Sequence, residues 1–201
     1  VDDVVNAINS VDSVGVRASI NEHGLVLTDT TGETAANLAV KNVGLTQTAS
    51  ELGLAQSVAA STLAGSDINT LSEDSQLAGL NDGLGIRTRA GLNDFRITAR
   101  DGTQFSVNLD DASTLGDVLD AINTAGGGKV TASINDDQRS LKLTDNTGGS
   151  GTLLVEARNN SMAAADLGID GGDTNDDGVL HGNQLIASIN SKLLKNLNGG
   201  T

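Results

Sequence analysis

The stretch Thr114–Asn135, TLGDVLDAINTAGGGKVTASIN, decides the predicted fold. From Leu115 to Ile122 its apolar residues fall at positions i, i+3, i+4 and i+7, which lie on one face of an α-helix. Thr114 stands where an N-cap is expected, and Asp117 follows at the third helical position, where a carboxylate suits the helix dipole. The pattern predicts a short amphipathic helix.

The residues after this helix predict a β-hairpin. Three glycines, Gly126–Gly128, are expected to end the helix because glycine adopts the left-handed geometry of a helix exit at low cost. Apolar and polar residues then alternate over Val130–Ile134 and again over Leu141–Asp145, as expected of half-buried strands. Between them, Asn135–Arg139 supplies a polar turn.

The same pattern occurs at the start of the chain. Placing residues 1–21 on residues 115–135 without a gap gives ten identical positions, namely Asp3, Val4, Ala7, Ile8, Asn9, Val16, Ala18, Ser19, Ile20 and Asn21. A second pair of segments, 49–54 and 164–169, is similar in the same way. The chain is therefore predicted to be a tandem repeat.

The predicted fold class is α+β, with tandem repeat units of antiparallel β-hairpins and short amphipathic helices. Residues 1–77 are expected to form a first repeat unit that is truncated at its N-terminus, and residues 78–193 a second unit. Residues 194–201 are expected to be the start of a third unit or a tail. The copies lie about 115 residues apart, well beyond the period of a solenoid repeat.

A further hairpin is predicted ahead of the second helix. Two segments of alternating apolar residues, 95–99 and 105–109, flank Asp101-Gly102, which is a strong two-residue turn signal. Phe95 and Phe105 are expected to face each other across this hairpin and to belong to the core.

The charge balance excludes some classes of partner. Asp and Glu number 26 against 12 Lys and Arg, which gives a net charge of −14. Nucleic acid and anionic membrane surfaces require cationic side chains, so neither is expected as a partner. The chain has no Cys, which excludes a disulfide framework and a thiolate metal site. No apolar run has membrane-spanning length.

An acidic loop, DTNDDGVLHGNQ, begins at Asp173 and matches the calcium-loop pattern D-x-N-x-D-G. Asp173, Asn175 and Asp177 would be the side-chain ligands of a calcium ion, and Val179 would offer its carbonyl oxygen. The last position of the pattern is weak, because Gln184 cannot give the bidentate carboxylate that normally completes such a site. The alternative is a solvated acidic turn that binds no metal.

No catalytic or other cofactor-binding residue is predicted. The two histidines, His23 and His181, have no companions at metal-ligand spacing, and a surface role is expected of both. The glycine-rich segment Gly148–Gly151 lacks the Gly-Lys-Ser/Thr ending of a phosphate loop and is expected to be a hairpin connection. The sequence also contains no nucleophile elbow.

Two segments of the chain resemble a known family. The Ile-Asn pair occurs at Ile8-Asn9 and at Ile122-Asn123, each time near the end of the helical pattern and ahead of the alternating strands. This arrangement is similar to the flagellin hook IN motif, which is found in flagellar hook-associated proteins, notably the filament cap protein, and in some flagellins. The linking segment 77–109 resembles these proteins more loosely.

The resemblance implies an extracellular structural protein of the bacterial flagellum, which associates with copies of itself and with flagellin or other axial proteins. Whole cap proteins carry long heptad helices at both termini, so a chain without them is expected to be the outward-facing head region. The motif has no known catalytic role, so no enzyme is expected. Two other classes stay open: a surface adhesin or repeat module, stiffened by calcium at the acidic loop, and a domain of a secreted hydrolase.

Overall fold

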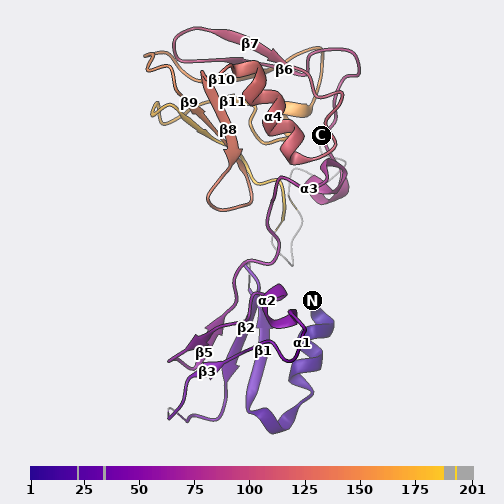
Figure 1. Cartoon of the computed structure of the whole chain (residues 1–201), viewed down its shortest axis with the longest axis vertical. Helices are drawn as coiled ribbons and strands as arrows, with labels where there is room; N and C mark the ends of the chain where they lie inside the picture. Colours follow the sequence, from indigo (N-terminus) through magenta and orange to yellow (C-terminus); the bar gives the residue numbers. More distant parts are fainter. Residues whose placement is uncertain (22, 34, 188–192, 194–201) are drawn as a thin grey trace. The chain divides into compact units, whose positions relative to one another are not determined.

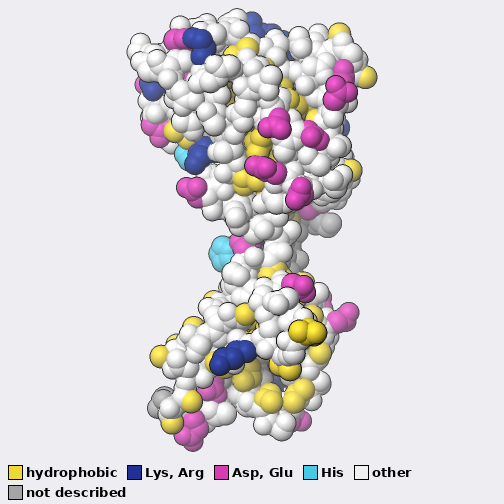
Figure 2. Space-filling model, viewed as in Figure 1, with side chains coloured by type: hydrophobic (Ala, Val, Ile, Leu, Met, Phe, Trp, Pro, Cys, Tyr) yellow, Lys and Arg dark blue, Asp and Glu magenta, His cyan; other side chains and the backbone are white. Residues whose placement is uncertain are grey.

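The computed structural model describes residues 1–21, 23–33, 35–187 and 193 (Figure 1). They fall into two compact units, which we call unit 1 (residues 1–69) and unit 2 (residues 70–187 and 193). The predicted α+β class is confirmed, because both units combine short helices with antiparallel strand pairs. The expected third unit or tail, residues 194–201, lies outside the described residues. Side chains of Asp and Glu are scattered over the visible face of both units (Figure 2).

Unit 1 contains two helices, a 3-10 turn and two small sheets. In chain order these elements are α1 (Asp2–Asn9), η1 (Asp12–Val14), β1 (Val16–Ile20), β2 (Leu25–Asp29), β3 (Leu38–Ala39), α2 (Thr48–Glu51), β4 (Ser57–Val58) and β5 (Thr62–Ala64). One sheet has the strand order β1-β2-β5, and the other pairs β3 with β4. Every pairing is antiparallel.

Unit 2 begins with a connector and a hairpin, after which its α-helices and strands follow in the same order as those of unit 1. The elements are η2 (Leu77–Gly79), α3 (Leu80–Gly83), β6 (Phe95–Thr98), β7 (Gln104–Val107), α4 (Leu115–Gly126), β8 (Val130–Ile134), β9 (Leu141–Asp145), β10 (Leu154–Ala157), α5 (Ala163–Asp166), β11 (Gly171–Gly172) and β12 (Val179–His181). Its sheets have the orders β11-β10-β6-β7 and β12-β9-β8. All pairings are antiparallel.

Helix α4 follows from its sequence at both ends. The Thr114 hydroxyl accepts from the Asp117 N–H at 3.2 Å, and the Asp117 carboxylate accepts from the Thr114 N–H at 2.9 Å, which completes a capping box. The helix ends where Gly127 takes φ 53°, in the left-handed region that favours glycine. The predicted apolar face, from Leu115 to Ile122, is buried.

Each unit has its own hydrophobic core. The larger core joins the inner face of α4 to both sheets of unit 2, and its fully buried side chains include Phe95, Ile122 and Leu143. The core of unit 1 has five buried residues, namely Ala18, Leu25, Leu27, Leu54 and Leu63. The residues of α1 only partly cover this small core, since none of them is buried.

Two details of the predicted hairpins are wrong. Across β6 and β7, Phe95 pairs with Val107 and Phe105 pairs with Ile97, so the two rings are diagonal neighbours rather than directly opposite. The segment Gly148–Gly151 is no hairpin connection, because β9 and β10, which it joins, belong to different sheets. Local alternation does not fix register, and it does not say which strand is the next partner.

None of the helices in the described part of the chain has the length and hydropathy of a membrane span.

The predicted boundary between the repeat units and the observed boundary between the compact units are different quantities. The boundary between residues 77 and 78 rests on similarity between sequence segments, whereas the division after residue 69 reflects the compactness of the fold. The repeat boundaries therefore stay a prediction.

Candidate functional site

The asparagine of the Ile-Asn pair in unit 2 joins helix α4 to the sheet. The Asn123 Oδ1 atom accepts from the Ala132 N–H at 2.7 Å, and the Asn123 Nδ2 atom donates to the Ala132 carbonyl at 3.2 Å. A side-chain amide has the same donor and acceptor as a peptide group, so Asn123 takes the place of a neighbouring strand at Ala132. The preceding residue, Ile122, is fully buried beneath the helix.

We call this pair of hydrogen bonds the asparagine clamp, and the same clamp occurs in unit 1. There the Asn9 Oδ1 atom accepts from the Ala18 N–H at 2.7 Å, and its Nδ2 atom donates to the Ala18 carbonyl at 2.9 Å. In both units the asparagine is nine residues ahead of the strand residue that it binds. The polar half of the Ile-Asn pair is therefore a structural contact, and its amide faces backbone rather than a ligand.

The capping carboxylate of α4 is held by a dense set of donors. Asp117 accepts from the N–H groups of Ser113 and Thr114, each at 2.9 Å, and from the Ser113 hydroxyl at 3.0 Å. These backbone hydrogen bonds, with the hydroxyl bonds adding to them, lower the pKa of Asp117 to about 2. The carboxylate stays ionised at neutral pH, and its negative charge stabilises the N-terminal end of α4.

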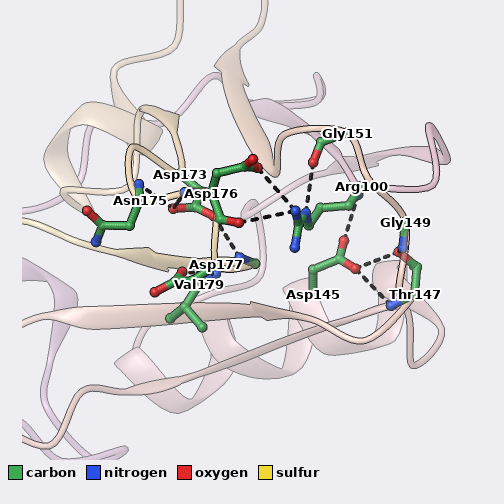
Figure 3. A network of polar contacts seen from close by, with 11 residues as sticks. Arg100, Asp145, Thr147, Gly149, Gly151, Asp173, Asn175, Asp176, Asp177 and Val179 are labelled. Carbon is green, nitrogen blue, oxygen red and sulfur yellow. Dashed lines mark hydrogen bonds and ion pairs between the residues drawn. The ribbon is translucent and has the colours of Figure 1, made fainter.

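A polar network joins the turn after β6, the end of β9 and the acidic loop (Figure 3). The Asp145 carboxylate accepts from the Arg100 N–H at 2.7 Å, and its other oxygen accepts from the Thr147 N–H at 2.8 Å. The Arg100 guanidinium donates to the Gly151 carbonyl at 2.8 Å and to the Asp176 carboxylate at 3.1 Å. One arginine thus holds three segments that are far apart in the sequence.

Asp173 organises the acidic loop between β11 and β12. One of its carboxylate oxygens accepts from the N–H groups of Asn175 and Asp176 at 2.9 and 3.1 Å, and the other accepts from the Gly178 N–H at 2.8 Å. Burial raises the pKa of the Asp173 carboxyl, but the three N–H donors and the nearby Arg100 outweigh it and lower the pKa below its ordinary value. Asp173 is only 7% exposed, so it stays in the loop as a buried carboxylate.

The other predicted calcium ligands lie on the same loop. Asn175 and Asp177 are exposed, and the Asp177 carboxylate accepts from the N–H of Val179, the first residue of β12, at 2.9 Å. Among the described residues no group of three or more His, Cys, Asp and Glu side chains has the arrangement of a metal site. The predicted site also includes the Asn175 amide and the Val179 backbone carbonyl, which belong to none of these classes of side chain, so calcium binding stays a prediction.

The two histidines lie at separate places in the structure. The His23 Nδ1 atom is 3.3 Å from the Asp67 carboxylate, and its side chain is 55% exposed. His181 ends β12, where it pairs with Lys142 of β9. The expectation that neither histidine is catalytic stays a prediction.

The sequence patterns do not predict the buried carboxylates of unit 2. Asp94, which is 0% exposed, accepts from the Arg89 N–H at 2.8 Å, the Ser161 hydroxyl at 2.7 Å and the Leu109 N–H at 3.0 Å. Asp166 binds Arg87 through both carboxylate oxygens, at 2.9 and 2.8 Å. No local signal marks these residues, because their partners are up to 79 positions away in the sequence.

Comparison with known proteins recognises one part of unit 2. A family model of the flagellin hook IN motif matches residues 94–147, from the residue before β6 to the loop after β9. No curated protein and no solved structure matches the chain. The predicted motif is thus confirmed at Ile122-Asn123, while the earlier Ile8-Asn9 pair lies outside the matched range. The chain carries a flagellin hook IN motif at residues 94–147, which indicates a flagellum-related structural protein.

Proposed function

We propose that the chain is an extracellular structural component of the bacterial flagellum, the head region of a hook-associated or filament-cap-like protein. Its partners are copies of itself and flagellin or other axial proteins. The observation that carries this proposal is the flagellin hook IN motif at residues 94–147.

The roles of the motif's polar residues support a structural function. Asp117, Asn123 and Asp145 all bind backbone groups of the same unit, where they fix a helix start, a helix end and a turn. A catalytic centre would instead direct several such groups toward one open site. The proposal therefore assigns no catalytic residue and no cofactor other than the calcium ion considered for the acidic loop.

The absence of cysteine permits a direct test of location. The Asp136 side chain is 98% exposed, so an Asp136→Cys variant of the full-length protein gives a single reactive thiol in this region. Intact cells treated with a membrane-impermeant maleimide dye should then show label on the flagellum. Label at the filament tip indicates a cap, label at the filament base indicates a hook junction, and label along the whole length indicates a filament component.

A buried cysteine gives the matched control. Ala164 is 0% exposed, so the Ala164→Cys variant should stay unlabelled unless unit 2 has unfolded. The parental strain corrects for other thiols. Label on the cell body and none on the flagellum would contradict the flagellar assignment.

The acidic loop favours a second candidate function, that of a surface adhesin or repeat module stabilised by calcium. The loop of residues 173–178 has no acidic equivalent in unit 1, where Ala59, Ala60 and Ser61 join β4 to β5. Label confined to the cell body, together with stabilisation by calcium, would support this candidate.

A further inference from the structure

Unit 1 has an apolar groove on its surface. The groove has a volume of about 400 Å³. Apolar side chains from α1, η1, the β1-β2 hairpin and the segment 40–54 line it, among them Val4, Ile8, Val14, Val16, Val43 and Leu52. Val43 is 79% exposed and Val14 is 52% exposed. Figure 2 shows several apolar side chains around a hollow on the visible face of this unit. An apolar face of this kind is typical of an interaction surface.

The equivalent residues of unit 2 are covered. Ile8 corresponds to Ile122, which is 0% exposed, and Val16 corresponds to Val130, which is 1% exposed. Leu52 corresponds to Leu167, which is also 0% exposed. In unit 1 all three side chains remain only partly buried. The same positions are therefore core in one unit and groove in the other.

The cover in unit 2 is the hairpin β6–β7. Its residues Phe95, Ile97 and Val107 are at most 1% exposed. The ring of Phe105 lies at the end of α4, where a Cβ atom on Gly126 would be 3.3 Å from it. These four apolar side chains extend the core over the face that stays open in unit 1.

The hairpin is also held through the backbone, and unit 1 offers the same type of edge. In unit 2, β10 pairs with β11 on one side and with β6 on the other. Its counterpart β3 pairs with β4, and no other described strand pairs with it. The Val40 N–H donates to the Gln56 carbonyl on the β4 side at 2.9 Å, so alternation directs the N–H groups of Ala39 and Lys41 to the opposite edge.

From these observations we infer that the groove and the β3 edge of unit 1 together form a docking site for an amphipathic β-hairpin of the β6–β7 type. In unit 2 the equivalent hairpin leads from β7 into α4, so the docked hairpin is expected to lie next to the N-terminal end of α1. Its inner strand pairs with β3, and its apolar face fills the groove. A hairpin from a second copy does not fit this role, because β6–β7 is already buried in its own unit. The inference is independent of the flagellar assignment.

The fit differs at the tip of the hairpin. In unit 2, Gly149 and Gly151 lie against the backbone of Arg100, where a Cβ atom on Gly149 would be 2.3 Å from the Arg100 carbonyl. The residue that corresponds to Gly149 in unit 1 is Glu33. The docked hairpin must therefore be shorter or bent at its turn, or Glu33 must move aside.

A graft tests the docking site in the full chain. Residues 93–114 copied directly ahead of Val1 reproduce the spacing of unit 2, because Val1 corresponds to Leu115. The graft should slow hydrogen exchange of the amides of residues 38–41 at least tenfold and reduce binding of an apolar dye. Adding Glu33→Gly to the graft should slow that exchange further.

The matched control carries Ser at the four copied positions that correspond to Phe95, Ile97, Phe105 and Val107. Equal exchange of residues 38–41 in the graft and in this control would overturn the inference. Protection of β8 from hydrogen exchange reports whether unit 2 remains folded.

Should the grafted chain fail to fold, the unmodified chain is titrated with a synthetic peptide of residues 93–110. Methyl shifts at Val14 and Val43 support the site, whereas no shift at millimolar peptide, or a dimer of the unmodified chain that buries Val43, overturns it.

Discussion

Unit 1 and residues 115–187 of unit 2 contain the same order of α-helices and strands, yet their first helices are buried to different extents. Both begin with a helix and a β-hairpin, and their hairpins have equivalent registers, with Val16 opposite Asp29 and Val130 opposite Asp145. Helix α4 buries Leu115, Val118, Leu119 and Ile122, whereas α1 buries no residue. The tandem repeat inferred from sequence stays a prediction, but the comparison of the two units needs only their observed geometry.

The difference separates two kinds of contact. Some hold the first helix of a unit to the hairpin that follows it, an arrangement that we call the frame, and others cover the apolar core. The asparagine clamp and the turn aspartate recur in both units, since Asp29 binds the Thr31 N–H at 2.8 Å just as Asp145 binds the Thr147 N–H. Closure of the core requires the additional hairpin β6–β7, which pairs with β10 and covers α4. The frame therefore forms from local polar contacts, and the burial of its apolar face depends on a separate segment.

The largest expected difference between the units comes from truncating the same core residue in each. Ile122→Ala should lower the free energy of unfolding of unit 2 by about 2–5 kcal/mol, because it removes fully buried methyl groups and leaves a cavity. Ile8→Ala should cost unit 1 less than about 2 kcal/mol, because Ile8 is only partly buried. Hydrogen exchange of β8 and β1 measures the two losses separately. Equal losses would contradict the view that the helix of unit 1 is less covered.

Removal of the asparagine clamp should affect both units by similar amounts. Asn123→Ala and Asn9→Ala each leave one strand N–H and one carbonyl without their amide partner, at a cost of about 1–3 kcal/mol. Urea unfolding followed by circular dichroism measures this loss. Replacement by Asp, which keeps the acceptor and removes the donor, serves as the matched variant. A loss in unit 2 alone would show that the clamp depends on a closed core.

The capping box should stabilise only unit 2, since α1 has no side-chain cap. Thr114→Ala should cost about 1 kcal/mol. Because the pKa of Asp117 is lowered to about 2 in the folded state, its carboxylate stabilises the fold above the unfolded pKa near 4, and this contribution is lost as the pH falls toward 2. Asp117→Asn should therefore lower the thermal midpoint at pH 7 and have little effect at pH 2.

Asp120 provides the control for this pH dependence, because it is an exposed aspartate on the same helix. Asp120→Asn should leave the pH dependence of the thermal midpoint close to that of the parent chain. If Asp117→Asn behaves in the same way, then the cap does not contribute through its charge.

The smallest expected effect concerns the acidic loop, which only unit 2 has. If Asp173, Asn175, Asp177 and Val179 bind calcium with a Kd of about 1 mM, then 2 mM calcium stabilises unit 2 by about 0.6 kcal/mol relative to chelator. Thermal melts with calcium and with chelator measure the shift, and Asp177→Ala should abolish it. An equal midpoint in both conditions, in the parent chain and the variant alike, would leave the loop as a solvated acidic turn.

The elements of this fold that depend on local pattern were predictable from the sequence. The period of Leu115–Ile122 and the cap at Thr114 specify α4, and the alternation around Asp101-Gly102 specifies β6–β7. The Ile-Asn pairs stand out in the sequence as a motif, but their sequence does not reveal that the amide binds the strand backbone. That contact depends on how the helix lies against the sheet.

Long-range pairing was not predictable in the same way. Nothing near Leu154–Ala157 indicates that this strand leaves the β8-β9 sheet and pairs with β6. The roles of Asp94 and Arg100 likewise depend on segments that meet only in the folded chain. Hydrophobic patterning specifies which faces are apolar, but it does not determine which segments cover them.

The asparagine clamp has a mechanical consequence. Asn123 and Asn9 each donate to and accept from one residue of the adjoining strand, so the helix cannot slide along the strand in either direction without breaking both bonds. A pulling force applied to the helix is therefore transmitted to the strand through these two hydrogen bonds as well as through the apolar core. In a flagellum-related structural protein, such an anchor would resist displacement of the helix under load.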